Sequence, residues 1–302
     1  SSHFCSSHWQ VTRPSFVRAC LPVMTVMQRK APLSTIQRAG SKRERSRSRR
    51  QEVKTKEPGK DFPDAVIRCD SLRDFLRPEC EAFKGMALVR SQKWDHVQHI
   101  FDQLHDSGVL GEMEPHMKLI PLASESSVSV QVDGAIRHLL SPLIRHGLPA
   151  DLADQIRQDA VATGSVVAEL LPEAAELMVS LELARENICA RWHRDNYVAR
   201  SIVSYNCSAT EYVHDDFADF ETFDDVARER AAICSVDKRV VHDRRAICNA
   251  GVGSILLMKG SLFPSRVNGL LHRSPAKFYR QDGSVATRMI LKVDVQRERA
   301  FL

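Results

Sequence analysis

The segment Cys189–Asn196, with the sequence CARWHRDN, places an imidazole and a carboxylate two residues apart. On an extended strand, residues i and i+2 point to the same face, so the side chains of His193 and Asp195 can aim at one point. A second histidine, His272, follows in the segment 270–275, LLHRSP. Two histidines and one carboxylate with open coordination positions form the facial triad that holds non-haem Fe(II) in oxygenases. We therefore expect these three residues to bind a metal ion, with Fe(II) favoured over Zn or Mn.

The same residues admit a second interpretation. His193 and Asp195 can form a hydrogen-bonded pair at the end of a strand while His272 packs elsewhere, in which case no metal is bound. Tyr205, on the next predicted strand, either orients a substrate or cosubstrate or belongs to the core. Both pairs of alternatives stay open at the level of sequence.

Charge is distributed unevenly along the 302 residues, whose formal net charge is +5. Residues 1–60 carry 14 Lys and Arg and three acidic residues, which leaves 29 basic and 35 acidic residues in 61–302. This larger part is mildly acidic and lacks the basic surface typical of nucleic-acid binding. The segment 41–50, SKRERSRSRR, is either a disordered charged linker or a basic patch for RNA binding or nuclear import. We expect nucleic-acid contact only through this arm.

The first 43 residues contain no Asp or Glu and are rich in Ser and Arg, a composition typical of mitochondrial or plastid transit peptides. The chain does not begin with methionine, so Met24 and Met27 are candidate starts of translation, and the sequence before them is then a gene-model artefact or part of a fragment. We expect 1–60 to be a disordered basic arm or transit peptide, because its composition buries too little apolar surface to offset the entropy of ordering.

The length of the apolar runs and the spacing of the cysteines indicate the kind of compartment in which the protein folds. No run of the sequence approaches the roughly 18 apolar residues that span a bilayer. The eight cysteines form no C-x-x-C pair and show no regular spacing, which argues against a disulfide framework. We expect a soluble protein of a reducing compartment without a membrane span.

The hydrophobic periodicity changes along the chain. Amphipathic helices are expected over 134–146 and 151–162, where apolar residues recur at helical spacing. Further on, short alternating segments separated by turn residues predict strands, among them 177–183 and 287–295. The final strand should present Met289, Leu291, Val293 and Val295 on one face.

These elements predict an α+β protein. We expect the helical region 61–165 to pack on a jelly-roll β domain, a cupin-like double-stranded β-helix, formed by 166–302. Residues 61–302 should form one folding unit. In such barrels, metal and small-molecule sites lie in the mouth and are lined by inward-facing side chains.

Several motifs together resemble an uncharacterised family, domain of unknown function 1826. The C-x-R-x-H-x-D pattern that ends at Asp195 is followed by T-E-Y at 210–212, a Gly-bounded apolar run over 251–260 and H-R-S-P at 272–275. The resemblance covers roughly residues 65–296 and by itself implies no particular reaction.

More distantly, the order of the candidate ligands is similar to that of iron- and 2-oxoglutarate-dependent dioxygenases. That resemblance implies Fe(II), 2-oxoglutarate and an arginine that follows the distal histidine and pairs with the far carboxylate of the cosubstrate through two parallel hydrogen bonds. Arg288 is the candidate, although it lies 16 residues past His272, a longer gap than is usual in that superfamily. A hairpin around Asp282 can absorb the surplus. Arg273 and Arg200 are the substitutes.

Three alternative functions are therefore compatible with the sequence. Each requires a different set of residues. A dioxygenase needs a metal, two free coordination positions and a carboxylate clamp. A cupin-like metal- or small-molecule-binding protein without turnover needs the metal ligands alone. A non-catalytic adaptor, whose basic arm binds nucleic acid or a partner, needs none of them and should tolerate the loss of His193.

Overall fold

The computed structural model describes residues 64–110, 116–123, 126–185, 189–229 and 239–296. The predicted arm, with its transit-peptide composition, lies outside the described residues. Among the described residues, no helix is long and apolar enough to cross a bilayer.

The helices and strands are β1 (Val66–Cys69), β2 (Gly85–Leu88), α1 (Gln98–Asp106), β3 (His116–Pro121), α2 (Val128–Arg145), α3 (Ala150–Leu170), β4 (Glu176–Ala184), β5 (Ala199–Ser204), β6 (Glu211–Val213), α4 (Phe220–Glu229), β7 (Cys248–Asn249), β8 (Ile255–Lys259), β9 (Leu271–Arg273) and β10 (Arg288–Val295). Short 3-10 turns occupy Leu72–Leu76, Pro78–Ala82, Asp95–Val97, Asp215–Phe217 and Arg244–Ala246.

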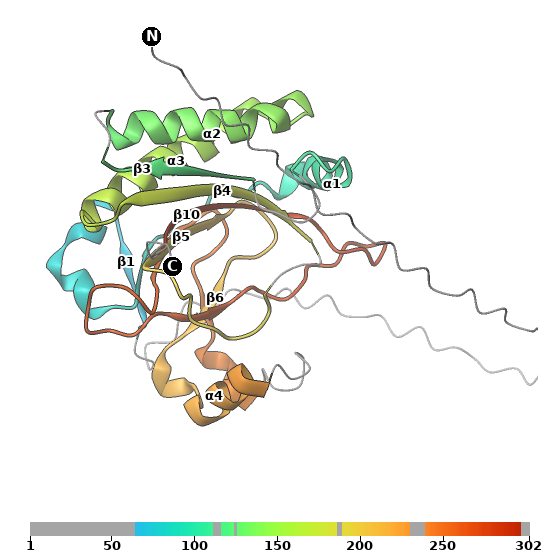
Figure 1. Cartoon of the computed structure of the whole chain (residues 1–302). Helices are drawn as coiled ribbons and strands as arrows, with labels where there is room; N and C mark the ends of the chain where they lie inside the picture. The colour runs from blue at the N-terminus through green and yellow to red at the C-terminus, as the bar shows by residue number, and fades with distance from the viewer. Residues whose placement is uncertain (1–63, 111–115, 124–125, 186–188, 230–238, 297–302) are drawn as a thin grey trace, which may run out of the picture. The chain divides into compact units, whose positions relative to one another are not determined.

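The elements are arranged in layers around two β-sheets, which confirms the predicted mixture of helix and strand (Figure 1). A seven-stranded sheet has the order β1-β2-β8-β5-β10-β4-β3, and a three-stranded sheet has the order β7-β6-β9. Helices α2 and α3 cover one face of the large sheet, the small sheet lies on its other side, and α4 lies beyond the small sheet (Figure 1). Three apolar clusters fill the spaces between these layers.

In strand β10, one face of the large sheet carries apolar core residues and the other carries charged residues. Met289, Leu291, Val293 and Val295 all pack in the core beneath the helices, as their alternation predicts. The intervening residues point toward the small sheet: Ile290 joins the second apolar cluster, and Arg288, Lys292 and Asp294 share its face. Charged side chains therefore line the inner face of β10.

The region expected to be helical also supplies three strands of the large sheet. β1 pairs in parallel with β2, β2 pairs with β8, and β3 forms the opposite edge beside β4. Helix α3 ends at Leu170, well past the predicted end at residue 162, and the additional turns contain Gly164. A Cβ atom built there would lie 2.9 Å from a methyl group of Val132 in α2, so the glycine lets the two helices approach closely.

Candidate metal centre

The backbone places the two predicted histidines opposite each other. The amide of His193 donates to the carbonyl of His272 at 2.9 Å, and the amide of His272 donates to the carbonyl of His193 at 3.0 Å. This isolated antiparallel pair extends the small sheet beyond β9. Directly paired residues of antiparallel strands carry their side chains on one face, and here the imidazole centroids lie 4.3 Å apart.

The Asp195 carboxylate faces both rings. Its Oδ1 lies 3.6 Å from Nε2 of His193, and its Oδ2 lies 3.6 Å from Nε2 of His272. Two ligand atoms about 2.1 Å from one ion are about 3.0–3.6 Å apart when their bonds meet at about 90–120°. The ligand atoms of the three residues all lie within 4.8 Å of one another, so their spacing fits a shared metal ion.

Both imidazoles are fixed through the ring nitrogen that faces away from the carboxylate. Nδ1 of His193 donates to the carbonyl of Arg191 at 2.8 Å, and Nδ1 of His272 donates to the carbonyl of Leu270 at 3.0 Å. A proton on each Nδ1 leaves the Nε2 lone pair available as an acceptor. Metal-ligating histidines almost always donate their other N–H in this way, which fixes the tautomer and the ring orientation.

Burial favours the neutral form of one candidate ligand, His272. Desolvation, and then the nearby charge of His193, lower the pKa of His272 to about 4. Burial alone would lower the pKa of His193 as well, but hydrogen bonds with the Cys189 thiol and the Arg191 carbonyl raise it above its ordinary value. At neutral pH the imidazole of His272 is therefore in the unprotonated state that metal binding requires.

Arg200 holds the carboxylate in place. Its Nη1 lies 3.1 and 3.0 Å from the two oxygens of Asp195, while its Nε and Nη2 each donate at 2.9 Å to an oxygen of Asp294. Asp294 is fully buried on β10, directly opposite Arg200 on β5. The guanidinium predicted as a substitute cosubstrate clamp is thus committed to two carboxylates of the chain itself.

Two other predicted binding residues lie away from the triad. Tyr205 is fully buried in the core beneath the helices, where its hydroxyl donates to Asp159 at 3.0 Å. Arg273 follows His272 directly and points to the other face of β9, where it donates to Glu211 at 2.7 Å and lies over the ring of Trp192. The geometry brings neither side chain to the three metal-ligand candidates.

Arg288, unlike Arg200, has no carboxylate partner among the described residues. The residue is 7% exposed, its Nη1 reaches only the carbonyl of Ser208 at 3.4 Å, and its Nε has no hydrogen-bond partner among the described residues. The charge of Glu182 lies close enough to raise the pKa of Arg288, but Glu182 is itself paired with Lys292 at 2.5 Å. Burial lowers the pKa of Arg288 to about 10.

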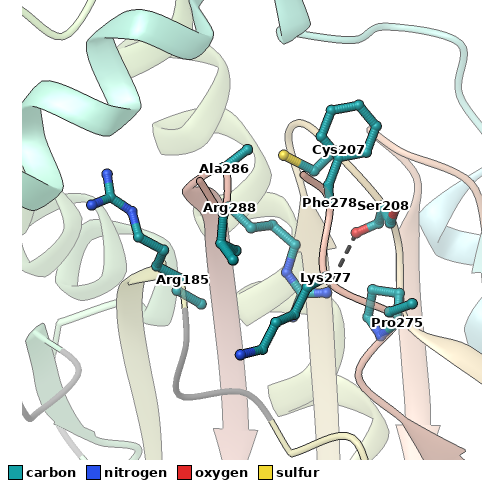
Figure 2. A pocket seen from close by; sticks show the side chains of 11 residues that line it. Arg185, Cys207, Ser208, Pro275, Lys277, Phe278, Ala286 and Arg288 are labelled. Atoms are coloured by element: carbon teal, nitrogen blue, oxygen red, sulfur yellow. Dashed lines mark hydrogen bonds between the residues drawn. The ribbon is translucent and has the colours of Figure 1, made fainter. Parts of the chain in front are cut away.

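A small pocket opens beside this guanidinium (Figure 2). Its volume is about 20 Å³, and its lining residues are Ala184, Arg185, Cys207, Ser208, Pro275, Ala276, Lys277, Phe278, Val285, Ala286 and Arg288. None of the three metal-ligand candidates lines it. Pro275 follows His272 by three residues, which span at most about 10 Å of extended chain. The pocket therefore adjoins the metal centre but is separate from it.

The long connection between His272 and Arg288 folds back on itself. Tyr279 and Val285 form an antiparallel bridge, and Gly283 turns the chain with φ +84°. The predicted hairpin is therefore present. Arg280 in this hairpin donates to the buried Asp102 of α1 at 2.6 Å, which ties the pocket wall to the helical layer.

Asp294 was not predicted from the sequence, although a signal for it was present. It lies in the apolar strand β10, on the face that carries Arg288 and Lys292 and is opposite to the core-facing residues. A carboxylate in a buried strand needs a cation or several hydrogen bonds. The identity of that cation, Arg200, depends on the pairing of β10 with β5.

A family model described as "Protein of unknown function (DUF1826)" matches residues 68–294. The chain belongs to this family. The matched region of the DUF1826 chain contains all three metal-ligand candidates and the segments that bring them together. No curated protein sequence matches the chain.

Several solved structures are similar to this DUF1826 protein at low TM-scores. A full-length Neurospora crassa protein in complex with alpha-KG gives a TM-score of 0.36 at 8% identity, covering 77% of this chain and 84% of that one. The same protein with alpha-KG and thymine gives 0.34 at 8% identity, with coverages of 77% and 85%. A prolyl hydroxylase from Trichoplax adhaerens, in complex with a hypoxia inducible factor peptide, gives 0.22 at 10% identity, with coverages of 67% and 91%. All three scores are below 0.5, so the functional argument rests on the geometry of this chain.

Proposed function

We propose that this DUF1826 protein binds Fe(II) through His193, Asp195 and His272 and acts as a 2-oxoglutarate-dependent oxygenase. The observation that carries the proposal is the convergence of two Nε2 atoms and one carboxylate, with both Nδ1 atoms tied to backbone carbonyls. Two histidines and one carboxylate that leave coordination positions open are the ligand set of non-haem Fe(II) oxygenases.

The connections between the sheets support a double-stranded β-helix. After β4 in the large sheet, the chain passes through His193 beside the small sheet, returns to β5, crosses to β6 and β7, and returns again to β8. It then crosses to β9 and finally back to β10. Neighbouring strands in both sheets of this region are antiparallel. Such alternation between two facing antiparallel sheets is the arrangement of a jelly roll.

Arg288 supports a carboxylate-bearing cosubstrate. A buried guanidinium without an ionic partner is costly, and a carboxylate matches its two parallel N–H donors. Arg288 begins β10 on the face that also carries Asp294, so it lies on the same side of the large sheet as the metal ligands. We infer that it binds the far carboxylate of 2-oxoglutarate.

Fe(II) and 2-oxoglutarate, when bound, supply the oxidative chemistry that hydroxylates or demethylates a substrate. The chain contributes orientation and exclusion of water. His193 and His272 present their Nε2 lone pairs, and Arg200 fixes the carboxylate of Asp195. His272 is 4% exposed, so one side of the centre is closed to solvent by the protein.

The size of the pocket favours a second candidate, a cupin-like metal-binding protein without turnover. A volume of about 20 Å³ holds about one water molecule. The carboxylate of a cosubstrate therefore enters only if the pocket wall, which includes Lys277 and Phe278, moves outward. A chain that binds the metal but does not open this pocket would be a binding module.

The deciding experiment is anaerobic purification followed by metal analysis and thermal melts with Fe(II), with and without 2-oxoglutarate. A site that binds the folded state alone raises the melting temperature by mass action. The oxygenase predicts a rise with Fe(II), a further rise with 2-oxoglutarate, and release of succinate and CO2 in air. A rise with Fe(II) alone supports the binding module, and no rise with Fe(II) rejects both.

A further inference from the structure

We propose that Arg200 and Asp294 are positioning residues of the metal centre, which orient the Asp195 carboxylate toward the two histidines. The inference rests on the proposed metal site and adds to it two residues that do not touch the ion. It assigns a function to Asp294, the one carboxylate of β10, which is 0% exposed.

The contacts divide the donors of Arg200 between two carboxylates. The Nε and Nη2 edge pairs with both oxygens of Asp294 at 2.9 Å, the two-bond geometry that fixes the plane of a guanidinium. The remaining nitrogen, Nη1, contacts both oxygens of Asp195. The ring of Tyr197 lies 4.5 Å from Arg200 Cζ and supports the same plane. Arg200 is thus held by Asp294 and in turn holds Asp195.

The carboxylate of Asp195 is consequently placed by contacts on two sides. Its two oxygens receive Nη1 of Arg200, and the same two oxygens each face one histidine Nε2 at 3.6 Å. Without Arg200, rotation of the carboxylate would be limited by the histidines alone. A flexible ligand must lose this rotational freedom when it binds an ion, so a held carboxylate binds more tightly.

Asp294 also sets the charge balance of the site. Arg200 and Asp294 together carry no net charge, which leaves the full negative charge of Asp195 available to a cation. If Asp294 were neutral, the positive charge of Arg200 would oppose the metal without compensation. Both the shape and the charge of Asp294 should therefore matter for metal affinity.

The test uses Co(II), a spectroscopic substitute for Fe(II) that is stable in air over the titration, on the full chain. Arg200→Lys keeps the charge but lacks the planar fork, so it cannot make the two-bond contact with Asp294 while also contacting both oxygens of Asp195. Asp294→Asn keeps the shape but removes the charge. We expect each variant to bind Co(II) about 10–100-fold more weakly than the wild type, the usual effect of losing a residue that orients a metal ligand. The visible Co(II) absorption bands should also change shape, because the carboxylate no longer has a fixed orientation.

Arg90→Lys is the matched control. Arg90 makes the same two-bond contact with a buried carboxylate, Asp159, at 2.6 and 2.8 Å, but none with the metal-ligand candidates. It should lower the melting temperature of the metal-free protein and leave the Co(II) affinity and spectrum unchanged. The proposal is overturned if Arg200→Lys and Asp294→Asn melt lower yet bind Co(II) with wild-type affinity and spectrum. If the wild type itself binds no Co(II) or Fe(II), the proposed metal site fails instead.

Discussion

Arg200 and Arg288 are both largely buried on the side of the large sheet that faces the small sheet, but their partners differ. Arg200 pairs with Asp195 and Asp294, whereas Arg288 pairs with no carboxylate among the described residues. The pKa values reflect this difference. Burial lowers the pKa of Arg288 to about 10, while the Asp294 and Asp195 carboxylates overcome the effect of burial and raise the pKa of Arg200.

This difference is the basis for proposing Arg200 as a positioning residue and Arg288 as a binding residue. Each of the three nitrogens of Arg200 already contacts a carboxylate of the chain, so Arg200 supports groups that are already in the fold. Arg288 carries a burial cost that nothing described in the fold offsets, and a bound carboxylate would offset it. Unpaired buried charges of this kind are concentrated at functional sites.

The largest expected effect comes from removing a metal ligand. His193→Ala and Asp195→Ala should each abolish the Fe(II)-dependent rise in melting temperature, because a three-ligand site has no spare ligand. The measurement is an anaerobic melt of each variant with and without Fe(II). His99→Ala, at an exposed position on α1, is the control and should respond to Fe(II) like the wild type. A retained response in both ligand variants would contradict the assignment of the site.

Exchange of Arg200 for methionine should lower stability, whereas the same exchange at Arg288 should not. Arg200→Met leaves two carboxylates without their cation and should destabilise the metal-free protein by about 3–5 kcal/mol. Arg288→Met removes an unpaired charge and should be neutral or stabilising by about 1 kcal/mol, as is common where function and stability conflict. It should also keep the Fe(II) response and lose the increment from 2-oxoglutarate. Urea unfolding and thermal melts measure both effects. Equal destabilisation by the two exchanges would remove the distinction between the arginines.

The sequence was sufficient to predict that His193, Asp195 and His272 lie together, but not which residues support them. The i, i+2 spacing placed His193 and Asp195 on one face, and the alternation in β10 placed its apolar residues correctly. The partnership of Arg200 with Asp294 could not be predicted, since it depends on which strands are neighbours and on their register. The position of Tyr205 had a local signal, because it shares the parity and the face of Val203, which is buried beneath the helices.

The protonation of His272 should make stability depend on pH. Its pKa is lowered to about 4 in the folded protein, against 6.5 in the unfolded chain. Between these values the unfolded state binds more protons, so the free energy of unfolding of the metal-free protein falls as the pH is lowered from about 6.5 to 4. The pKa of His193 is raised, so His193 contributes in the opposite direction, with stability lost as pH rises above about 6.5.

The variant His272→Gln isolates this contribution. It cannot take up the proton, so the stability advantage of the wild type over the variant should be smaller at pH 5 than at pH 7. Urea unfolding of the metal-free proteins at the two pH values measures the change. An advantage that does not vary with pH would show that His272 is not the titrating group. With metal present, acidification should in addition weaken binding, because protons compete for the imidazoles.

The smallest expected effect concerns Tyr205 and tests whether it belongs to the core. Its hydroxyl donates to Asp159, which also pairs with Arg90, and all three lie on the helix side of the large sheet. Tyr205→Phe removes one buried hydrogen bond to a charged group and leaves the ring in place. This should cost about 1–3 kcal/mol of stability. Because Arg90 still neutralises Asp159, the cost should lie toward the lower end of that range. Fe(II) and 2-oxoglutarate should raise the melting temperature of the variant by the same increments as in the wild type. A normal stability with a reduced 2-oxoglutarate increment would instead return Tyr205 to the cosubstrate site.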